Sequence, residues 1–192
     1  MNAASVSRPG WLPSAPPSLA ALHRYWLFRP GALTAGLRAL GRFELRVLRE
    51  YAGGAPADEA HGMGLAAGTP VWIREVVMAV NGADCVAARS LTPLAASHGV
   101  WQGMRRLRTR PLADMLYHDR SVQRSAFEVA RLHARQALHK TVRGLPCAGE
   151  PHVRRPLARR SVFRRLGQPL MVEECFLPAF WRQAQARADW RV

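Results

Sequence analysis

An Asn-Gly pair at positions 81 and 82 is the feature that most constrains the fold of this chain. It follows Val71–Val80, a run rich in Val, Ile and Trp, and precedes a second apolar run, Cys85–Leu91. β-branched and aromatic residues favour strands, and Asn-Gly is favoured in two-residue hairpin turns because both turn positions need positive φ. The sequence therefore predicts a β-hairpin here, and antiparallel pairing as the basis of the fold.

Other segments carry weaker signals of the same kind. Ser161–Leu166 and Pro169–Leu177 predict a second hairpin, with its turn at Gly167-Gln168. Alternation and helical spacing predict further strands over Phe43–Tyr51 and Val122–His133, and helices over Leu19–Phe28, Ala32–Leu40 and Phe180–Trp190. The Ala and Glu content of Val122–His133 leaves a helix there as the alternative. Ala52–Pro70 and Gln136–Pro156 are predicted to be connecting loops. Strands paired by hairpins, with helices set apart from them, indicate an α+β domain built on an antiparallel sheet.

The length of 192 residues fits one domain of ordinary size. Hydrophobic residues make up 48% of the chain, which is enough to bury a substantial core. Residues 1–17 hold Pro9, Pro13, Pro16 and Pro17, and we expect them to form a flexible N-terminal arm. Residues 18–192 are expected to form the single domain.

The net charge of +15 arises from 28 Lys and Arg residues against 13 Asp and Glu residues. A balance this basic implies an anionic partner, such as a nucleic acid, a phospholipid surface or a small molecule. The cations concentrate between Arg131 and Arg165, where Glu150 is the only acidic residue. The Arg clusters are not interleaved with aromatic residues, which argues against specific nucleic-acid binding. The excess charge is expected to steer an anionic substrate, or to give weak peripheral association with an anionic membrane.

The sequence predicts neither a membrane span nor export. No stretch approaches the roughly 18 consecutive apolar residues that a span requires, and the N-terminus lacks the pattern of a signal peptide. The three cysteines, Cys85, Cys147 and Cys175, are odd in number and far apart. This usage predicts a reducing, cytoplasmic setting.

Charged residues within the predicted strands are the candidates for a functional site. Side chains alternate along a strand, so Arg74 shares a face with Val76 and other apolar residues, and burying it is costly unless an anion meets it. A structural ion pair accounts for such an Arg as well as a ligand site does. Glu173 and Glu174 fall on opposite faces of their predicted strand, and because both faces are apolar, periodicity does not choose between them. A strand Arg and a strand Glu in facing hairpins, with Arg89 as a second cation, predict a polar pocket on an apolar sheet.

Signatures of metal and nucleotide sites are absent from the sequence. The seven His residues show neither H-E-x-x-H spacing nor pairing with Cys, so no metal site is expected. No G-x-S-x-G or Walker sequence occurs.

Several short motifs follow one another in a characteristic order and spacing. They are V-W-I-R-E-V-V (71–77), N-G (81–82), A-R-S (88–90), T-R-P-L (109–112), R-R-S (159–161), G-Q-P-L (167–170) and E-C-F-L-P-A (174–179). Together, over roughly residues 33–179, they resemble the bacterial chorismate pyruvate-lyase family. No single motif is diagnostic, but their order and spacing together are specific.

The resemblance implies an antiparallel sheet with helices packed on one side and covering a buried ligand cavity. It implies a monomer that converts chorismate to 4-hydroxybenzoate and pyruvate, the first step of ubiquinone synthesis, without a cofactor or metal. It places the family's binding Arg at Arg74 and its Glu at Glu174, which selects Glu174 over Glu173. The family's two flap residues, which bind substrate mainly through backbone groups, fall on Leu33 and Leu112.

These assignments suggest roles and leave alternatives. Arg74 is expected to donate hydrogen bonds to the ether oxygen or the developing phenolate, and Glu174 to receive or relay the ring proton. Arg89 is expected to orient the pyruvyl carboxylate. The alternatives are a non-catalytic ligand sensor, similar to the effector domains of GntR-type regulators, and a basic nucleic-acid-binding protein. An enzyme that makes another hydroxybenzoate isomer also remains open.

Overall fold

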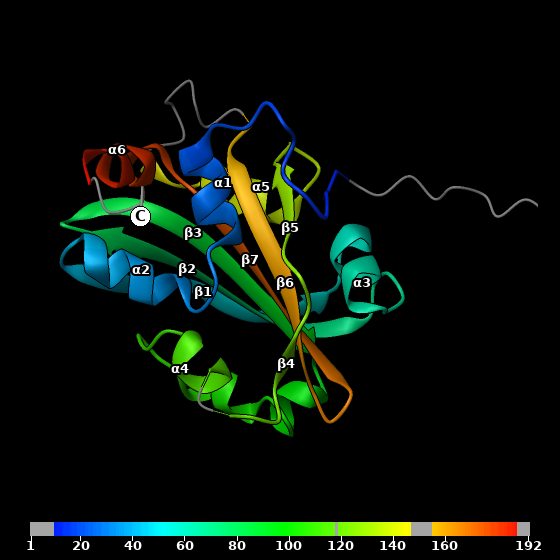
Figure 1. The fold of residues 1–192 in the computed structure, drawn as a ribbon. Coiled ribbons are helices and arrows are strands. Elements are labelled where there is room, and N and C mark those ends of the chain that lie inside the picture. The colour runs from blue at the N-terminus through cyan, green and yellow to red at the C-terminus, as the bar shows by residue number, and fades with distance from the viewer. Residues whose placement is uncertain (1–9, 118, 147–154, 188–192) are drawn as a thin grey trace, which may run out of the picture.

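One antiparallel sheet of seven strands forms the centre of the computed structural model, which describes residues 10–117, 119–146 and 155–187 (Figure 1). The strands are β1 (Phe43–Gly54), β2 (Pro70–Val80), β3 (Ala83–Pro93), β4 (Gln123–Arg124), β5 (Glu128–Arg131), β6 (Leu157–Arg165) and β7 (Gln168–Phe176). Their order is β1-β2-β3-β7-β6-β4, and β5 also pairs with β6. The two predicted hairpins therefore lie side by side, because β3 of the first pairs with β7 of the second.

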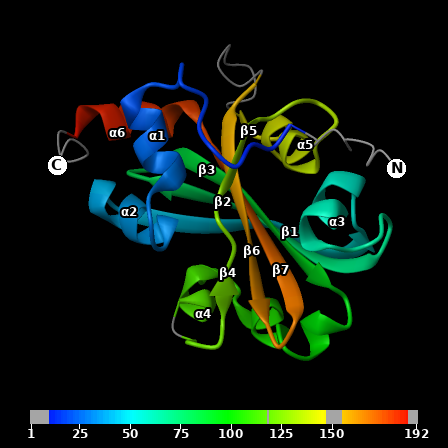
Figure 2. The same ribbon diagram turned by 45° about the vertical axis from the view of Figure 1, so that its right-hand side comes forward.

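Helices lie on both faces of the sheet (Figures 1 and 2). They are α1 (Ala21–Phe28), α2 (Leu33–Leu40), α3 (Ala57–Met63), α4 (Ala113–Leu116), α5 (Ala137–Arg143) and α6 (Pro178–Ala186). Helices α1, α2 and α6 share a core with Val76 and Met78 of β2. Helices α3 and α5 pack with Ile73 and Val77, which point to the opposite face because side chains alternate along the strand.

The hairpin at Asn81-Gly82 is confirmed. Asn81 and Gly82 have φ of 52° and 78°, and Val80 pairs with Ala83 across the two-residue turn. The second hairpin is also present, but its predicted turn is wrong by one residue. Arg165 pairs with Gln168, and the turn residues are Leu166 and Gly167, with φ of 48° and 75°.

The α+β class and the antiparallel sheet are confirmed, and helices do cover one face. They are not confined to that side, because α3 and α5 lie on the other. Both occur where the sequence predicted loops, within Ala52–Pro70 and Gln136–Pro156. Each has seven residues and no side-chain N-cap hydrogen bond, so contacts with the sheet, rather than local signals, hold them in place.

Residues 10–17 are packed against the domain, although the sequence suggested a flexible arm over 1–17. Trp11 is buried, and Leu12 exchanges two backbone hydrogen bonds of 2.8 Å with Val129 of β5. The Trp11 side chain packs in the apolar core that contains Leu138 and Val142 of α5. Residues 1–9 lie outside the described residues.

Two further sequence-based expectations concern the whole chain. No helix within the described ranges is long and apolar enough to cross a membrane. Cys85 and Cys175 are both buried, whereas Cys147 lies outside the described residues.

Candidate active site

A cavity of about 60 Å³ lies between the sheet and the segments that carry α2 and α4. Its floor is one face of the central strands, with Arg74, Ala88, Ser90, Arg159, Val172 and Glu174 among the lining side chains. Leu33 and Leu112 line it from the covering segments. The structure therefore brings together four of the five predicted site residues: Arg74, Glu174, Leu33 and Leu112.

The pairing register explains why Arg74 and Glu174 face the same space. Residues paired directly across an antiparallel ladder share a face. Ala88 pairs with both Val76 and Glu174, and Val76 lies two residues from Arg74 on β2. A side chain on β2 and one on β7 thus reach the same cavity, although 100 positions of sequence separate them.

Arg74 is almost wholly buried, with 2% of its side chain exposed, and is held on two sides. Its Nε donates to Glu50 Oε1 at 2.8 Å, and its Nη2 donates to the carbonyl oxygens of Arg108 and Arg110. Its Nη1 has no hydrogen-bond partner among the described residues. Burial lowers the pKa of the guanidinium, and the charge of Glu50 counters that shift. The result is a positioned cation with one N–H₂ group available in the cavity.

Glu174 is paired with an arginine that the sequence reading did not select. Arg159 of β6 lies directly opposite Glu174 in the ladder, and its Nε donates to Glu174 Oε2 at 2.6 Å. Arg159 Nη1 donates to the carbonyl oxygens of Trp26 and Arg29, at the end of α1, at 3.1 and 3.3 Å. Arg159 is therefore a cavity residue that fixes both the carboxylate and the neighbouring helix.

The missed arginine follows from the misplaced turn. A turn at Gly167-Gln168 would have set Ser161, instead of Arg159, opposite Glu174. Moving the turn back by one residue shifts every pair of the hairpin by two positions on one strand, which brings Arg159 into place. Correct turn placement alone would have revealed this pair.

Residues at the N-terminal end of the helix in each covering segment line the cavity. Ala32, Leu33 and Thr34 line the cavity at the start of α2, which has no side-chain N-cap. The first N–H groups of a helix lack partners within it and favour an anion. On the other covering segment, Pro111, Leu112 and Ala113 line the cavity where α4 begins.

A hydrogen bond joins the two covering segments. Tyr117, which follows α4, donates its hydroxyl to the carbonyl oxygen of Gly31, which precedes α2, at 3.0 Å. The cavity volume is well below the roughly 300 Å³ typical of small-molecule sites. The two covering segments therefore lie close over the floor and leave little free space beneath them.

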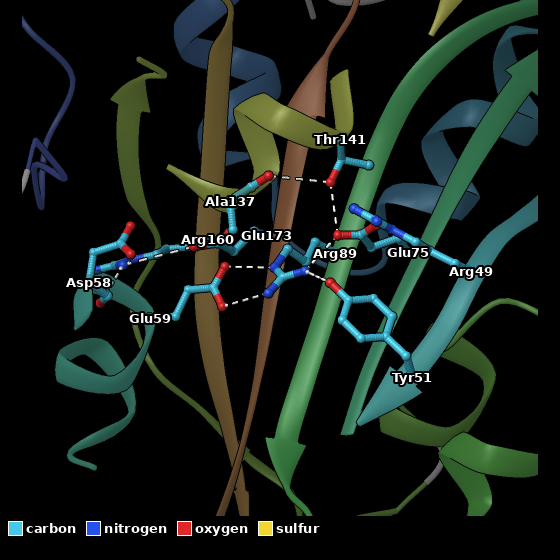
Figure 3. A network of polar contacts seen from close by, with 10 residues as sticks. All are labelled: Arg49, Tyr51, Asp58, Glu59, Glu75, Arg89, Ala137, Thr141, Arg160 and Glu173. Carbon is cyan, nitrogen blue, oxygen red and sulfur yellow. Dashed lines mark hydrogen bonds and ion pairs between the residues drawn. The ribbon is translucent and has the colours of Figure 1, made fainter. Parts of the chain in front are cut away.

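The assignment of Arg89 to the cavity is wrong, because its side chain lies on the opposite face of the sheet (Figure 3). Its Nε and Nη2 donate to the two carboxylate oxygens of Glu59 in α3 at 2.7 and 3.1 Å, and its Nη1 donates to Glu75 and Tyr51. Burial alone would lower the pKa of Arg89, but the hydrogen bonds and charge of Glu59 raise it above its usual range.

A register irregularity causes this reversal. In a regular hairpin about Asn81-Gly82, Arg74 would pair with Arg89 and share its face. The ladder shifts by one residue between Met78 and Ala79, so Arg74 pairs with Ser90, and Arg89 pairs with Glu75. A shift of one residue moves a side chain to the other face.

Opposite the cavity, charges alternate across the sheet in one continuous row. Neighbouring strands pair Arg49, Glu75, Arg89, Glu173, Arg160 and Glu128 in that order, from β1 to β5. Burial raises the pKa of Glu173 well above its usual range, and the nearby Glu59 carboxylate raises it further. Glu173 therefore belongs to this row, and its neighbour Glu174 to the cavity. This agrees with the assignment that the family resemblance implied.

Two comparisons with known proteins address the identity of the site. A family model described as chorismate lyase matches residues 5–186. A protein named probable chorismate pyruvate-lyase from Bordetella pertussis is 63% identical over 179 residues, which cover 92% of this chain and 93% of that protein. The chain belongs to the chorismate lyase family. A probable chorismate pyruvate-lyase 1 from Pseudomonas entomophila is 40% identical over 172 residues, or 90% of this chain and 91% of that protein.

Solved structures outside the chorismate lyase family share its fold. The C-terminal domain of a histidine utilization repressor from Pseudomonas syringae pv. tomato has a TM-score of 0.52 at 15% identity, and covers 72% of this chain and 93% of that one. The effector domain of PhnF from Mycobacterium smegmatis has a TM-score of 0.51 at 16% identity, with 78% and 90% covered. At such low identity the likeness shows the fold alone.

The described side chains of this chorismate lyase family member do not form a metal site. Within the described ranges, no group of three or more His, Cys, Asp and Glu residues could hold a metal ion. The polar side chains that line the cavity are two guanidiniums (Arg74 and Arg159), one carboxylate (Glu174) and the hydroxyls of Thr34, Ser90, Tyr117 and Ser161. Such groups bind and orient an anionic organic molecule and can move a proton.

Proposed function

We propose that this protein is a chorismate pyruvate-lyase, which converts chorismate to 4-hydroxybenzoate and pyruvate without a metal or cofactor. Membership of the family supports the reaction class. The observation that carries the proposal within the structure is the cavity itself, which sets the cation Arg74 and the carboxylate Glu174 on one apolar sheet face. The substrate has two carboxylates and is therefore a dianion.

From the enzyme, the reaction requires substrate binding and proton transfer. The C–O bond between the ring and the enolpyruvyl oxygen breaks, and the adjacent ring carbon loses its proton, so that the ring becomes aromatic. The released enolpyruvate takes up a proton and becomes pyruvate. Aromatisation supplies the driving force. The enzyme therefore has to orient the substrate and move one proton, which favours a rigid, closed cavity.

Each cavity residue has a role in this proposal. Arg74 donates charge-assisted hydrogen bonds through its unpaired Nη1 to the ether oxygen, on which negative charge develops as the C–O bond breaks. Glu174 receives or relays the ring proton. The backbone amides beside Leu33 and Leu112 hold the ring carboxylate at the two covering segments. Ordered opening of these segments lets substrate in and product out, so product release is slow.

The proposal extends to the setting of the enzyme. It acts as a monomer in the cytoplasm, at the first step of ubiquinone synthesis, and binds no specific nucleic acid. The basic region between Arg131 and Arg165 steers the dianion toward the cavity or gives weak association with anionic membranes. Failure of the protein to bind anionic lipid vesicles at low salt would refute the membrane association. It would not affect the proposed catalytic activity.

The test is to incubate the purified protein with chorismate and to separate the products by chromatography. Standards of 2-, 3- and 4-hydroxybenzoate identify the isomer. The expected product is the 4-isomer together with pyruvate, and Arg74→Ala is expected to abolish most of the activity. Binding of 4-hydroxybenzoate without any turnover would instead favour the ligand-sensor alternative that the GntR-type fold suggests.

A further inference from the structure

We propose that Arg159 is the second substrate-binding cation of the cavity and holds the enolpyruvyl carboxylate. This inference rests on the proposed function, because it assigns the part of chorismate that 4-hydroxybenzoate lacks. Sequence analysis predicted this role for Arg89, whose guanidinium is bound to Glu59 and Glu75 on the far face of the sheet. The cavity therefore needs another cation for the second carboxylate.

Hydrogen bonding leaves one end of Arg159 available. Its Nε is used by Glu174, and its Nη1 by the carbonyl oxygens of Trp26 and Arg29. Its Nη2 has no partner within the described part of the chain, and it is not among the enclosed polar atoms that lack one. Because Arg159 lines the cavity, these N–H groups open onto it.

A purely structural role does not account for this arrangement. The side chain of Arg159 is only 2% exposed, so its charge is almost completely removed from bulk water. Its Nη2 group, unlike its Nε and Nη1, therefore keeps two N–H donors for a ligand. A carboxylate satisfies such a group well, since the guanidinium fork matches its two oxygens.

The two cavity arginines stand on opposite sides of the floor. Arg74 is on β2 and Arg159 is on β6, with β3 and β7 between them. Three strand spacings of about 4.8 Å, together with an offset of two residues along the strands, separate their backbones by about 16 Å, and the two side chains reach inward from there. Small residues, Ala88 and Ser90, lie on the intervening β3. This layout leaves space above Ala88 and Ser90 for a ligand whose adjacent ether oxygen and carboxylate reach one guanidinium each.

Substitution of Arg159 is expected to weaken the binding of chorismate but not that of 4-hydroxybenzoate. Arg159→Met keeps the length of the side chain and removes the charge and the N–H groups. We expect it to raise the KM for chorismate about 10- to 100-fold, which corresponds to the loss of a charge-assisted hydrogen bond. The Kd for 4-hydroxybenzoate, measured by calorimetry, is expected to stay within threefold, because that ligand has no second carboxylate.

Arg124→Met is the matched control. Arg124 and Arg159 both place their guanidinium carbon over the ring of Phe127, at 4.0 and 4.2 Å, but Arg124 is exposed and does not line the cavity. In this control, the KM for chorismate and the Kd for 4-hydroxybenzoate are expected to stay within threefold of the wild-type values. Arg159→Lys keeps the charge without the fork, and is expected to fall between the wild type and Arg159→Met for chorismate. It also serves if Arg159→Met does not fold.

Two results would overturn the inference. An unchanged KM for chorismate would show that Arg159 does not contact the substrate. Equal weakening of both ligands would show that it acts only by holding Glu174. If the wild type makes no product from chorismate, the proposed function fails, and the Kd values of the wild type and Arg159→Met for chorismate itself still decide whether Arg159 binds a dianion.

Discussion

The buried Glu173 predicts an unusual dependence of stability on pH. The charge row and Glu59 together contain three guanidiniums (Arg49, Arg89 and Arg160) and four carboxyl groups (Glu59, Glu75, Glu128 and Glu173). Glu173 is 2% exposed, and its Oε1 lies 3.9 Å from Arg160 Nη1 with no hydrogen-bond partner among the described residues. Protonation of Glu173 would balance the charges, in agreement with its raised pKa.

The raised pKa of Glu173 sets the sign and the size of this pH dependence of stability. Between about pH 4.3, where an unfolded Glu titrates, and the higher pKa of the folded state, the native protein binds one more proton than the unfolded chain. The free energy of unfolding therefore falls by about 1.4 kcal/mol per pH unit as pH rises through this interval. Glu173→Gln keeps the shape and removes the titration, so this contribution to the slope disappears.

Urea unfolding followed by Trp fluorescence, at half-unit steps from pH 5 to pH 8, measures the difference between wild type and Glu173→Gln. The variant is expected to become progressively more stable relative to the wild type as pH rises. Glu44→Gln, which changes an exposed carboxylate paired with Arg42, is the matched control and is expected to leave the slope unchanged. Parallel curves for wild type and Glu173→Gln, with the variant less stable throughout, would refute a protonated Glu173.

Two further substitutions test the closed cavity and the corrected position of Arg89. Tyr117→Phe removes the hydrogen bond between the covering segments, worth about 0.5–1.5 kcal/mol, and is expected to speed 4-hydroxybenzoate dissociation about 2- to 12-fold in stopped-flow fluorescence; an unchanged rate would exclude this bond from the opening step. Arg89→Met leaves the buried carboxylate of Glu59 without its cation and Glu75 with Arg49 alone, and is expected to lower the free energy of unfolding by about 3–5 kcal/mol. Its KM for chorismate, measured where the variant is folded, is expected to stay within threefold, whereas a large rise would return Arg89 to substrate binding.

Local chemistry made the first hairpin predictable, and long-range pairing limited the rest. Asn81-Gly82 encodes its turn within two residues. Alternation then correctly placed Arg74 on the apolar face of its strand. The face of Arg89 depended on a one-residue irregularity near Met78, which the sequence of the hairpin does not reveal.

The short helices were missed for a related reason. Helix α5 begins without a side-chain cap, and part of its anchorage is the hydrogen bond from Thr141 to Glu75, 66 residues earlier in the chain. Helix α3 is held in the same way by Glu59 on Arg89. These partners are distant in the sequence and come together only in the folded sheet. The local composition of the two segments therefore predicted loops.

Glu174 and Arg74 were found by two independent routes. Strand alternation identified them as charged residues in apolar rows, and the motif resemblance then distinguished Glu174 from Glu173. The structure places both on the cavity and Glu173 behind the sheet. Arg159 belonged to a quoted motif but had no assigned role, because its importance depends on the register that sets it opposite Glu174.

The most direct test of the account is the simultaneous measurement of both products from chorismate. Pyruvate is followed by a coupled dehydrogenase assay, and 4-hydroxybenzoate by chromatography, for the wild type and Glu174→Gln. The account predicts a one-to-one ratio for the wild type and a fall of about 100-fold or more in the rate of both products for Glu174→Gln. Wild-type product formation that Glu174→Gln leaves unchanged would contradict the account, and so would pyruvate release without 4-hydroxybenzoate.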